Sequence, residues 1–220
     1  MKIVNISQEI KELIPEASLG ILQCGVKVEK SNKELIKILD YTLGVAAETL
    51  EGGNITDYPH IGATRKAYRA LGKDPTKYRN SAEAMLRRTK QGKGLYHINN
   101  VVEVNNILSI ASGFSLGTYD TSKIREEILL ERAVEGSQYE GIGKELLNIE
   151  YLPALKDDSG YFGNPTSDST RAMITESTEE IIMVIYSFEG EEGLEELLDK
   201  AIELLKVHCS GEDFQRAIIT

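Results

Sequence analysis

The segment EIIMVIYSF, residues 180–188, most constrains the fold, because nearly all of its side chains are apolar and its composition is typical of strands. Such a strand has no polar face to turn to water, so it belongs in the centre of a sheet that is covered on both faces. At 220 residues the chain is long enough to bury such a core without disulfides or metals. We therefore expect a central sheet flanked by helices.

Helical periodicity and capping signals predict the other elements. Ser31 and Glu34 form an S-x-x-E capping box that starts a helix ending at Gly52-Gly53. The further predicted helices span residues 7–13, 57–71, Ser81 to Gly92 with Ser81 as its cap, 99–113, and an acidic amphipathic helix at 194–205 that closes the chain. The further predicted strands span residues 17–28, 127–134 and 145–151, and a glycine-rich polar loop covers 157–168.

The order of these elements favours an α+β fold. Helices come first, strands follow and a helix comes last, so alternating βαβ units are not expected. A mixed sheet flanked by helices is the predicted architecture. No internal repeat or linker divides the chain, which predicts one domain over residues 1–220.

The sequence has no feature of a membrane or secreted protein. No apolar run approaches the ~18 residues that span a bilayer, and the apolar stretch at the N-terminus is too short for a signal peptide. Cys24 and Cys209 lie far apart and read as reduced thiols rather than a disulfide or metal pair. We expect a cytoplasmic protein.

Charge is distributed unevenly along the chain. The net charge of −10 alone argues against a nucleic-acid partner, but residues 65–93 hold ten basic and two acidic side chains, a net charge of +8 that leaves −18 for the rest. This segment is either a footprint for a polyanion or a solvated helical face balanced by acids elsewhere. The side chains predicted to bind tRNA are Arg65, Arg69, Arg79, Arg87, Arg88, Lys90 and Lys93. Of these, we expect Arg65, Arg69, Arg87 and Arg88 to share one exposed face.

Sequence templates for several chemistries are absent. His60, His97 and His208 have no metal-ligand spacing, and no G-x-S-x-G elbow, P-loop or G-x-G-x-x-G is present. We therefore expect no metal and no cofactor.

Polar residues cluster in two places. Asn99-Asn100 and Asn105-Asn106 lie in the predicted helix 99–113. The loop from Gly160 to Arg171 is the second, and there glycine lets backbone N–H groups approach a ligand. Both clusters have a structural alternative, because Asn, Asp, Ser and Thr are also common in caps and turns.

Three blocks of the sequence resemble the B3/B4 editing domain of the phenylalanyl-tRNA synthetase β subunit. Residues 98–106, INNVVEVNN, resemble the signature I-N-N-V-V-D-x-T-N, and residues 112–120 resemble the block that ends G-Q-P-L-H-A-F-D. Residues 160–164 and 175–178 resemble the G-x-M-G-G…T-x-x-T segment. Small free-standing B3/B4 proteins also share the Lys73-Asp74-Pro75 turn and the segment YRNSAEAMLRR, so the resemblance covers roughly residues 60–190.

The resemblance implies an α+β module that hydrolyses mischarged aminoacyl-tRNA in trans. Its partner would be tRNA or aminoacyl-tRNA, with no membrane and no DNA, and hydrolysis of a reactive ester requires no cofactor. Two alternatives stay open: a module of the same fold that binds tRNA or an amino-acid-like ligand without turnover, and a paralogue with a new small-molecule substrate.

The family's site residues carry over only in part. Asn106 matches the family's asparagine, whereas Asn105, Gly117 and Val184 stand where it has threonine, histidine and the glutamate that reads tyrosine. Without that glutamate, we expect tyrosyl-tRNA to be a poor substrate. No general base is assigned.

We predict a ligand pocket between the asparagine-rich helix and the loop from Gly160 to Arg171. Asn106 would contact the ester or ribose, and backbone N–H groups near Gly163 would face an oxyanion. Asn164 and Thr166 would position a water, and Asp168 would hold the amino group of the substrate or orient that water. The predicted catalytic residues are Asn106, Gly163, Asn164 and Asp168. The predicted substrate-binding residues are Asn105, Gly117, Thr166, Ser169, Arg171 and Val184.

Overall fold

The apolar segment 180–188 is a central strand, as its composition predicts. In the computed structural model, which describes residues 1–143 and 146–220, this strand is β9 (Glu180–Ser187). It pairs antiparallel with β2 (Ser18–Gly25) and with β3 (Ser115–Asp120), and β10 (Glu212–Ile219) extends the sheet beyond β2 in the order β10-β2-β9-β3.

A second four-stranded sheet lies against one face of the first. Its order is β1 (Ile3–Ile6), β4 (Glu127–Arg132), β7 (Pro153–Asp157) and β8 (Gly160–Gly163), with β1 and β4 parallel and the other pairs antiparallel. Ile182 and Val184 of β9 share a buried apolar cluster with Leu130 and Leu155 of the second sheet. A separate two-stranded ribbon joins β5 (Gln138–Glu140) and β6 (Leu146–Asn148).

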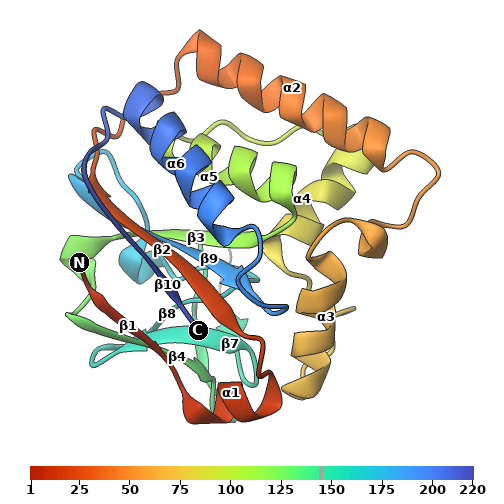
Figure 1. Cartoon of the computed structure of the whole chain (residues 1–220), viewed down its shortest axis with the longest axis vertical. Helices are drawn as coiled ribbons and strands as arrows, with labels where there is room; N and C mark the ends of the chain where they lie inside the picture. Colours follow the sequence, from red (N-terminus) through yellow and green to blue (C-terminus); the bar gives the residue numbers. More distant parts are fainter. Residues whose placement is uncertain (144–145) are drawn as a thin grey trace.

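Helices cover the other face of the first sheet (Figure 1). Leu22 and Ile185 of that sheet join one buried cluster with Val104 and Leu198 of the helices. The helices of this layer are α2 (Lys33–Thr49), α4 (Ser81–Lys90), α5 (Asn100–Ser112) and α6 (Leu194–His208), while α1 (Gln8–Leu13) and α3 (Ile61–Ala70) lie at the opposite end of the molecule in Figure 1. Three short 3₁₀ helices, η1 (Ile55–Asp57), η2 (Thr121–Lys123) and η3 (Thr170–Ala172), complete the described elements. The α+β prediction is confirmed.

The predicted boundaries are confirmed for α5 and are wrong for three other helix starts, among them α3, which begins at Ile61 rather than at residue 57. The Asn99 side chain caps α5 by accepting from the Val102 N–H, and Gly113 ends it with φ of 82°. Helix α2 is capped by Asn32 rather than Ser31, and α4 by Asn80 rather than Ser81. An adjacent asparagine, one residue after Ser31 in α2 and one residue before Ser81 in α4, accepts the N-terminal N–H bonds, so the predicted serine caps are not used.

Several strands were not predicted from the sequence. Strand β8 lies inside the segment 157–168 that was expected to be a loop, and β10 follows α6, so the acidic helix does not close the chain. Of the predicted strand 145–151, residue 145 lies outside the described residues and β6 spans Leu146–Asn148. Cys24 and Cys209 are both buried free thiols. Within the described ranges, no helix is both long and apolar enough to span a bilayer.

Candidate functional site

The buried carboxylate of Glu83 binds two arginines of the basic segment, residues 65–93. Glu83 of α4 has an exposed side-chain fraction of 0% and accepts hydrogen bonds from Arg65 Nη1 at 3.0 Å and from Arg87 Nε at 2.9 Å. The Arg65 side chain is only 13% exposed. The expectation that the arginines share one exposed face is therefore wrong for Arg65, because an acid inside the fold holds it.

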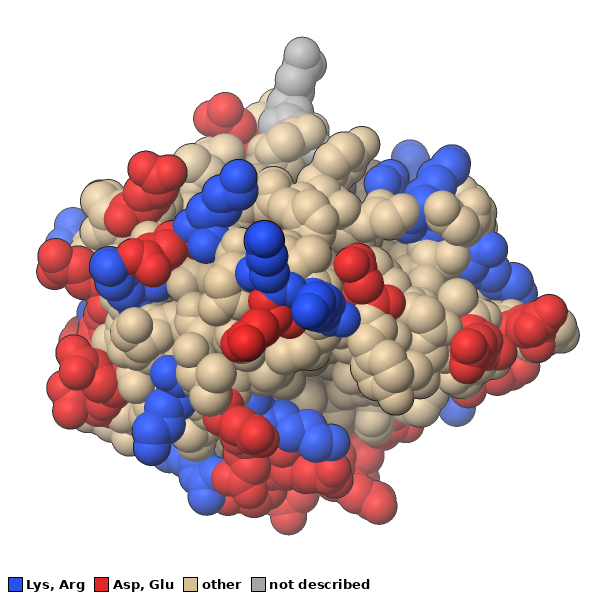
Figure 2. Space-filling view, turned by 90° about the horizontal axis from the view of Figure 1, so that it is seen from above, with Lys and Arg blue, Asp and Glu red and all other residues tan. Residues whose placement is uncertain are grey.

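The rest of the basic segment is more open. Arg69, Arg79 and Lys93 are exposed, whereas Arg88 Nη2 donates to the Gly94 carbonyl at 2.9 Å and Lys90 Nζ donates to the Gly53 carbonyl at 2.6 Å. Seen from above the molecule of Figure 1, basic and acidic side chains are interspersed in Figure 2. The segment is thus partly an internal framework, and tRNA binding by its exposed members stays a prediction.

The two asparagine pairs of α5 have different surroundings. Asn100 is buried and links three segments, because its amide donates to the carbonyls of Lys27 and His208, both at 2.9 Å, and accepts from the Glu29 N–H. Asn105 Oδ1 accepts from Thr118 Oγ1 at 2.9 Å. Asn106 is half-buried. The first pair, Asn99 and Asn100, therefore has a structural role.

Side chains of the predicted catalytic loop are bonded to tyrosines. Asn164 is 3% exposed; its Nδ2 donates to the Tyr139 hydroxyl at 2.5 Å, and its Oδ1 accepts from the Thr166 N–H at 2.7 Å. The Thr166 hydroxyl lies 2.8 Å from the Tyr68 hydroxyl. These contacts organise the turn that follows β8, which is the structural alternative for these residues.

Asp168 is bonded to a third tyrosine. Its Oδ1 accepts from the Tyr119 hydroxyl at 2.7 Å, and that hydroxyl lies 2.9 Å from the hydroxyl of Tyr186. Burial among these rings raises the pKa of the Asp168 carboxyl to about 7, although the hydrogen bonds from Tyr119 and the Asn164 N–H act in the opposite direction. Burial also raises the pKa of the Tyr119 phenol, and the nearby Asp168 carboxyl adds to this. Both forms of this carboxyl are therefore accessible near neutral pH.

Two predicted site glycines make room for the Tyr119 ring. A Cβ atom at Gly117 or at Gly163 would overlap the Tyr119 hydroxyl. Gly117 lies opposite Val184 in the β3–β9 register, and Val184 is 0% exposed. The side chain of Tyr119 therefore fills the space beside these glycines, and Val184 belongs to the core between the sheets.

Ser169 and Arg171 have local partners. Ser169 Oγ accepts from the Arg171 N–H at 3.2 Å and so caps η3. Arg171 Nη2 lies 2.9 Å from the buried Asp157 carboxylate. Burial alone would raise the pKa of Asp157, but hydrogen bonds from Arg171 and from the N–H groups of Arg125 and Ser159 hold it below its usual value. These contacts of Ser169 and Arg171 stabilise the C-terminal end of the loop from Gly160 to Arg171.

Two polar contacts of the predicted pocket lie on opposite faces of β3. Thr118 and Tyr119 are successive strand residues, so their side chains point to opposite faces of the sheet. Asn105 bonds to Thr118, whereas Asp168 bonds to Tyr119. Asn105 and Asp168 are thus held apart, and a pocket shared by Asn106 and the loop stays a prediction.

The structure instead places a cavity beside the start of α5. Its volume is about 510 Å³, and its walls come from residues 29–31, 97–99 and 174–176 together with Ile36 and Glu103. None of the residues that line this cavity is among the site residues predicted from the sequence. Ile98, Asn99 and Glu103 lie within the signature 98–106, which was the available signal.

Glu103 is the central group of this cavity wall. It is 0% exposed; its Oε1 accepts from the Ile98 N–H at 2.8 Å, and its Oε2 accepts from the Ser31 hydroxyl. His97 Nδ1 lies 3.5 Å from the same Oε1, and the His97 side chain is 53% exposed. A buried carboxylate and a partly exposed histidine thus lie within ion-pair distance of each other at the cavity's edge. Over residues 1–143 and 146–220, no group of three His, Cys, Asp or Glu side chains is arranged to hold a metal ion.

Two comparisons with known proteins give a match. A family model described as B3/4 domain matches residues 63–209. Among solved structures, the chain is similar to an N-terminal fragment of the phenylalanyl-tRNA synthetase beta-subunit from Pyrococcus horikoshii, with 12% identity and a TM-score of 0.49 over 99% of this chain. The chain spans about half of that fragment, 50% of its length. A search of curated proteins finds no match.

Proposed function

Because the chain belongs to the B3/4 domain family, we propose that it is a trans-acting hydrolase of the ester bond in mischarged aminoacyl-tRNA. The observation that supports this function is the cavity of about 510 Å³ at the N-terminal end of the signature helix, where Glu103 lies within ion-pair distance of His97. Ester hydrolysis needs a concave site, an oriented water and a group that accepts a proton. The cavity supplies the concave site, and His97 supplies the proton acceptor.

The substrate should differ from tyrosyl-tRNA. Val184, at the position where the resembled domain reads the tyrosine hydroxyl, is fully buried, and Tyr119 fills the space beside Gly117 and Gly163. The glutamate that would read a tyrosine hydroxyl is therefore absent, and the cavity proposed to hold the substrate has Ile36, Ile98 and Ile174 in its wall. An apolar amino acid is the better candidate.

A non-catalytic module that binds tRNA or an amino-acid-like ligand is the second candidate. Asn164 and Asp168, two predicted catalytic residues, are engaged with Tyr139 and Tyr119. Polar side chains held in this way stabilise a loop and leave fewer groups for chemistry. Binding without turnover would need only the exposed basic residues and the cavity.

A deacylation assay separates the two candidates. Purified protein is mixed in excess with a panel of tRNAs, each esterified with a different amino acid, and loss of the ester is followed against the spontaneous rate. We expect at least one tRNA carrying an apolar amino acid to be deacylated, and tyrosyl-tRNA to be cleared slowly. Binding of every tRNA without acceleration would favour the second candidate, and no binding at all would exclude both.

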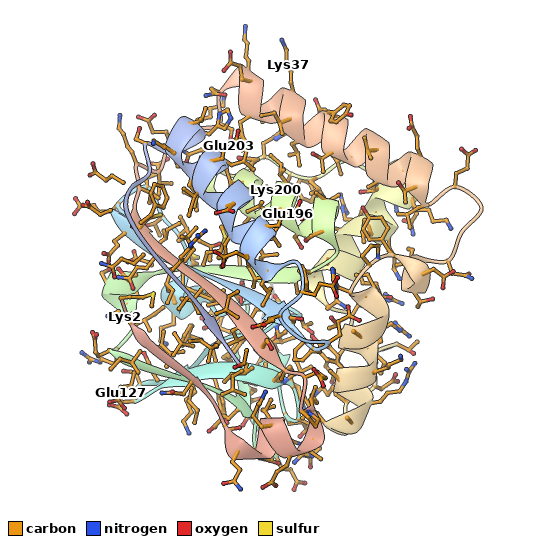
Figure 3. All side chains as sticks on the ribbon, viewed as in Figure 1. Lys2, Lys37, Glu127, Glu196, Lys200 and Glu203 are labelled. Atoms are coloured by element: carbon orange, nitrogen blue, oxygen red, sulfur yellow. The ribbon has the colours of Figure 1, made fainter. Side chains whose placement is uncertain are left out.

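The role of the basic segment is tested by salt dependence. Each phosphate contact to a single strand should contribute a slope of about −0.7 in log affinity against log salt. Arg69→Ala and Lys93→Ala, which remove exposed cations of the segment, should flatten that slope. Lys200→Ala on α6 (Figure 3) is the matched control, because its side chain is 59% exposed and lies on another helix. An unchanged slope in all variants would remove the segment from the interface.

A further inference from the structure

The cavity beside α5 combines an apolar wall with an acidic one. Ile36, Ile98 and Ile174 supply the apolar side. The acidic groups of the wall are the carboxylates of Glu29, Glu103 and Glu176. The basic groups are Lys30, in the wall, and the neighbouring Lys27, which forms an ion pair with Glu29. Its volume of about 510 Å³ is within the range of roughly 300–1,000 Å³ that small-molecule sites occupy.

His97 has the arrangement of a general base. Its Nδ1 faces the Glu103 carboxylate, which is itself fixed by the Ile98 N–H and the Ser31 hydroxyl. With Nδ1 turned toward that carboxylate, 3.5 Å from its Oε1, Nε2 is the nitrogen left to accept a proton from water. The 53% exposure of the side chain gives water access to it.

An aromatic platform stands next to this histidine. Tyr96 is 76% exposed, and the Arg88 guanidinium lies 5.1 Å from the centre of its ring. Arg88 is anchored in turn by the Gly94 carbonyl. An exposed aromatic ring with a neighbouring cation is a surface on which a nucleic-acid base stacks while a phosphate is neutralised.

From this juxtaposition we propose, on the basis of the function proposed above, that the cavity receives the aminoacyl-adenosine end of the tRNA and that His97 is the catalytic base. The terminal base stacks on Tyr96, the amino-acid side chain lies against the isoleucine wall, and the α-ammonium group faces the acidic wall. The substrate class is therefore an ester of an apolar amino acid with a free amino group.

The hydrolysis then balances with the groups present. The water oxygen bonds to the ester carbonyl carbon as its proton passes to His97 Nε2. The bond between that carbon and the ribose oxygen breaks, and the ribose oxygen takes the proton from His97. The amino acid leaves as a carboxylic acid that loses its remaining proton to solvent; the acidic wall repels the resulting carboxylate, whereas the ester carried only the ammonium charge. The cavity thus discriminates substrate from product.

Binding is tested with a probe that cannot be hydrolysed, 3′-valylamino-3′-deoxyadenosine, titrated into the full chain by calorimetry and by NMR. We expect the affected amide signals to come from residues 29–31, 97–99 and 174–176. Tyr96→Ala should weaken binding about 10-fold, since stacking on an aromatic ring contributes about 1–3 kcal/mol. Tyr41→Ala, which removes a tyrosine that is 74% exposed on α2, should not. N-acetylation of the probe should also weaken binding. Signals confined to the loop 163–168, or no binding, would overturn the assignment of the cavity.

Catalysis is tested on the aminoacyl-tRNA that the wild-type protein clears fastest. His97→Ala should lower kcat about 100-fold or more and leave probe affinity within about 2-fold, which separates a role in catalysis from a role in binding. Glu103→Gln should also lower kcat and leave probe affinity nearly unchanged. Because Glu103 is buried, far-ultraviolet circular dichroism checks that this variant is folded. If the wild-type protein hydrolyses and His97→Ala is fully active, the role of His97 is wrong while the proposed function stands. If the wild-type protein binds the probe in the cavity but clears no tRNA, hydrolysis itself and the role of His97 are both wrong.

Discussion

Replacing Asp168 with asparagine should change how stability depends on pH. The Asp168 carboxyl lies among tyrosine rings, and burial there raises its pKa from the usual 3.8 to about 7. Below about pH 4 the folded and unfolded chains both hold the proton, so the stability of the protonated form is fully present. As pH rises toward about 7 only the folded chain still holds it, so stability falls through this window and then levels off.

The size of the effect follows from the pKa change. A tenfold difference in proton affinity corresponds to about 1.4 kcal/mol, so a change from 3.8 to about 7 corresponds to an upper limit of about 4 kcal/mol. Asp168 keeps part of its surface exposed, and solvent screens such a group, so we expect about half of this limit, ~2 kcal/mol. An asparagine is neutral at every pH and can still accept the Tyr119 hydroxyl hydrogen bond.

The measurement is urea unfolding of the wild-type protein and Asp168→Asn from about pH 4 to about pH 8. The free energy of unfolding of the variant should gain about 2 kcal/mol relative to the wild-type protein across this range, because other titrating groups cancel in the difference. Asp158→Asn, which removes an exposed carboxylate of the β7–β8 turn, is the control and should show a nearly constant difference. A constant difference for Asp168→Asn, or a variant that loses stability relative to the wild-type protein as pH rises, would refute the reasoning.

Three further substitutions test the packing around the candidate sites. Glu83→Gln removes the buried carboxylate that holds Arg65, and urea unfolding should show a loss of about 3 kcal/mol; a loss below about 1 kcal/mol would mean that the pair is not buried as described. Gly117→Ala places a methyl group against the Tyr119 hydroxyl, and the free energy of unfolding should fall by about 1–3 kcal/mol; an unchanged Tm would contradict the close approach. Val184→Glu puts an unpaired carboxylate between the two sheets, so near-ultraviolet circular dichroism should show loss of the native fold; a folded variant that gains tyrosyl-tRNA hydrolysis would show that this position reaches a substrate.

Local elements could be predicted from the sequence because their determinants are close in the chain. Asn99 and Gly113 bound α5 through hydrogen bonds to residues three or four positions away, and the apolar run of β9 marks a central strand whatever its partners are. The helix starts at Ser31 and Ser81 were misplaced by one residue, because a serine and the adjacent asparagine compete for the same cap and only the final backbone decides between them.

The B3/4 membership could also be predicted from the sequence, because the matching blocks are short runs that are recognisable without their partners. The same blocks did not reveal how their side chains are used. Nothing in the run that contains Asn164 or Asp168 shows that tyrosines from distant strands bond to them. Equally, the basic composition of residues 65–93 does not show that Glu83 draws Arg65 inward.

Only the tertiary structure decided where a ligand could enter. Asn105 bonds to Thr118 and Asp168 bonds to Tyr119. Thr118 and Tyr119 point to opposite faces of the sheet, so Asn105 and Asp168 are held apart. The cavity forms where residues 29–31, 97–99 and 174–176 converge, and sequence spacing does not determine that distance. Caps and strand patterns depend on bonds within a few residues, so the sequence by itself determined them. Cavities and buried ion pairs depend on how whole sheets and helices pack, because the groups that form them are brought together only when the chain folds.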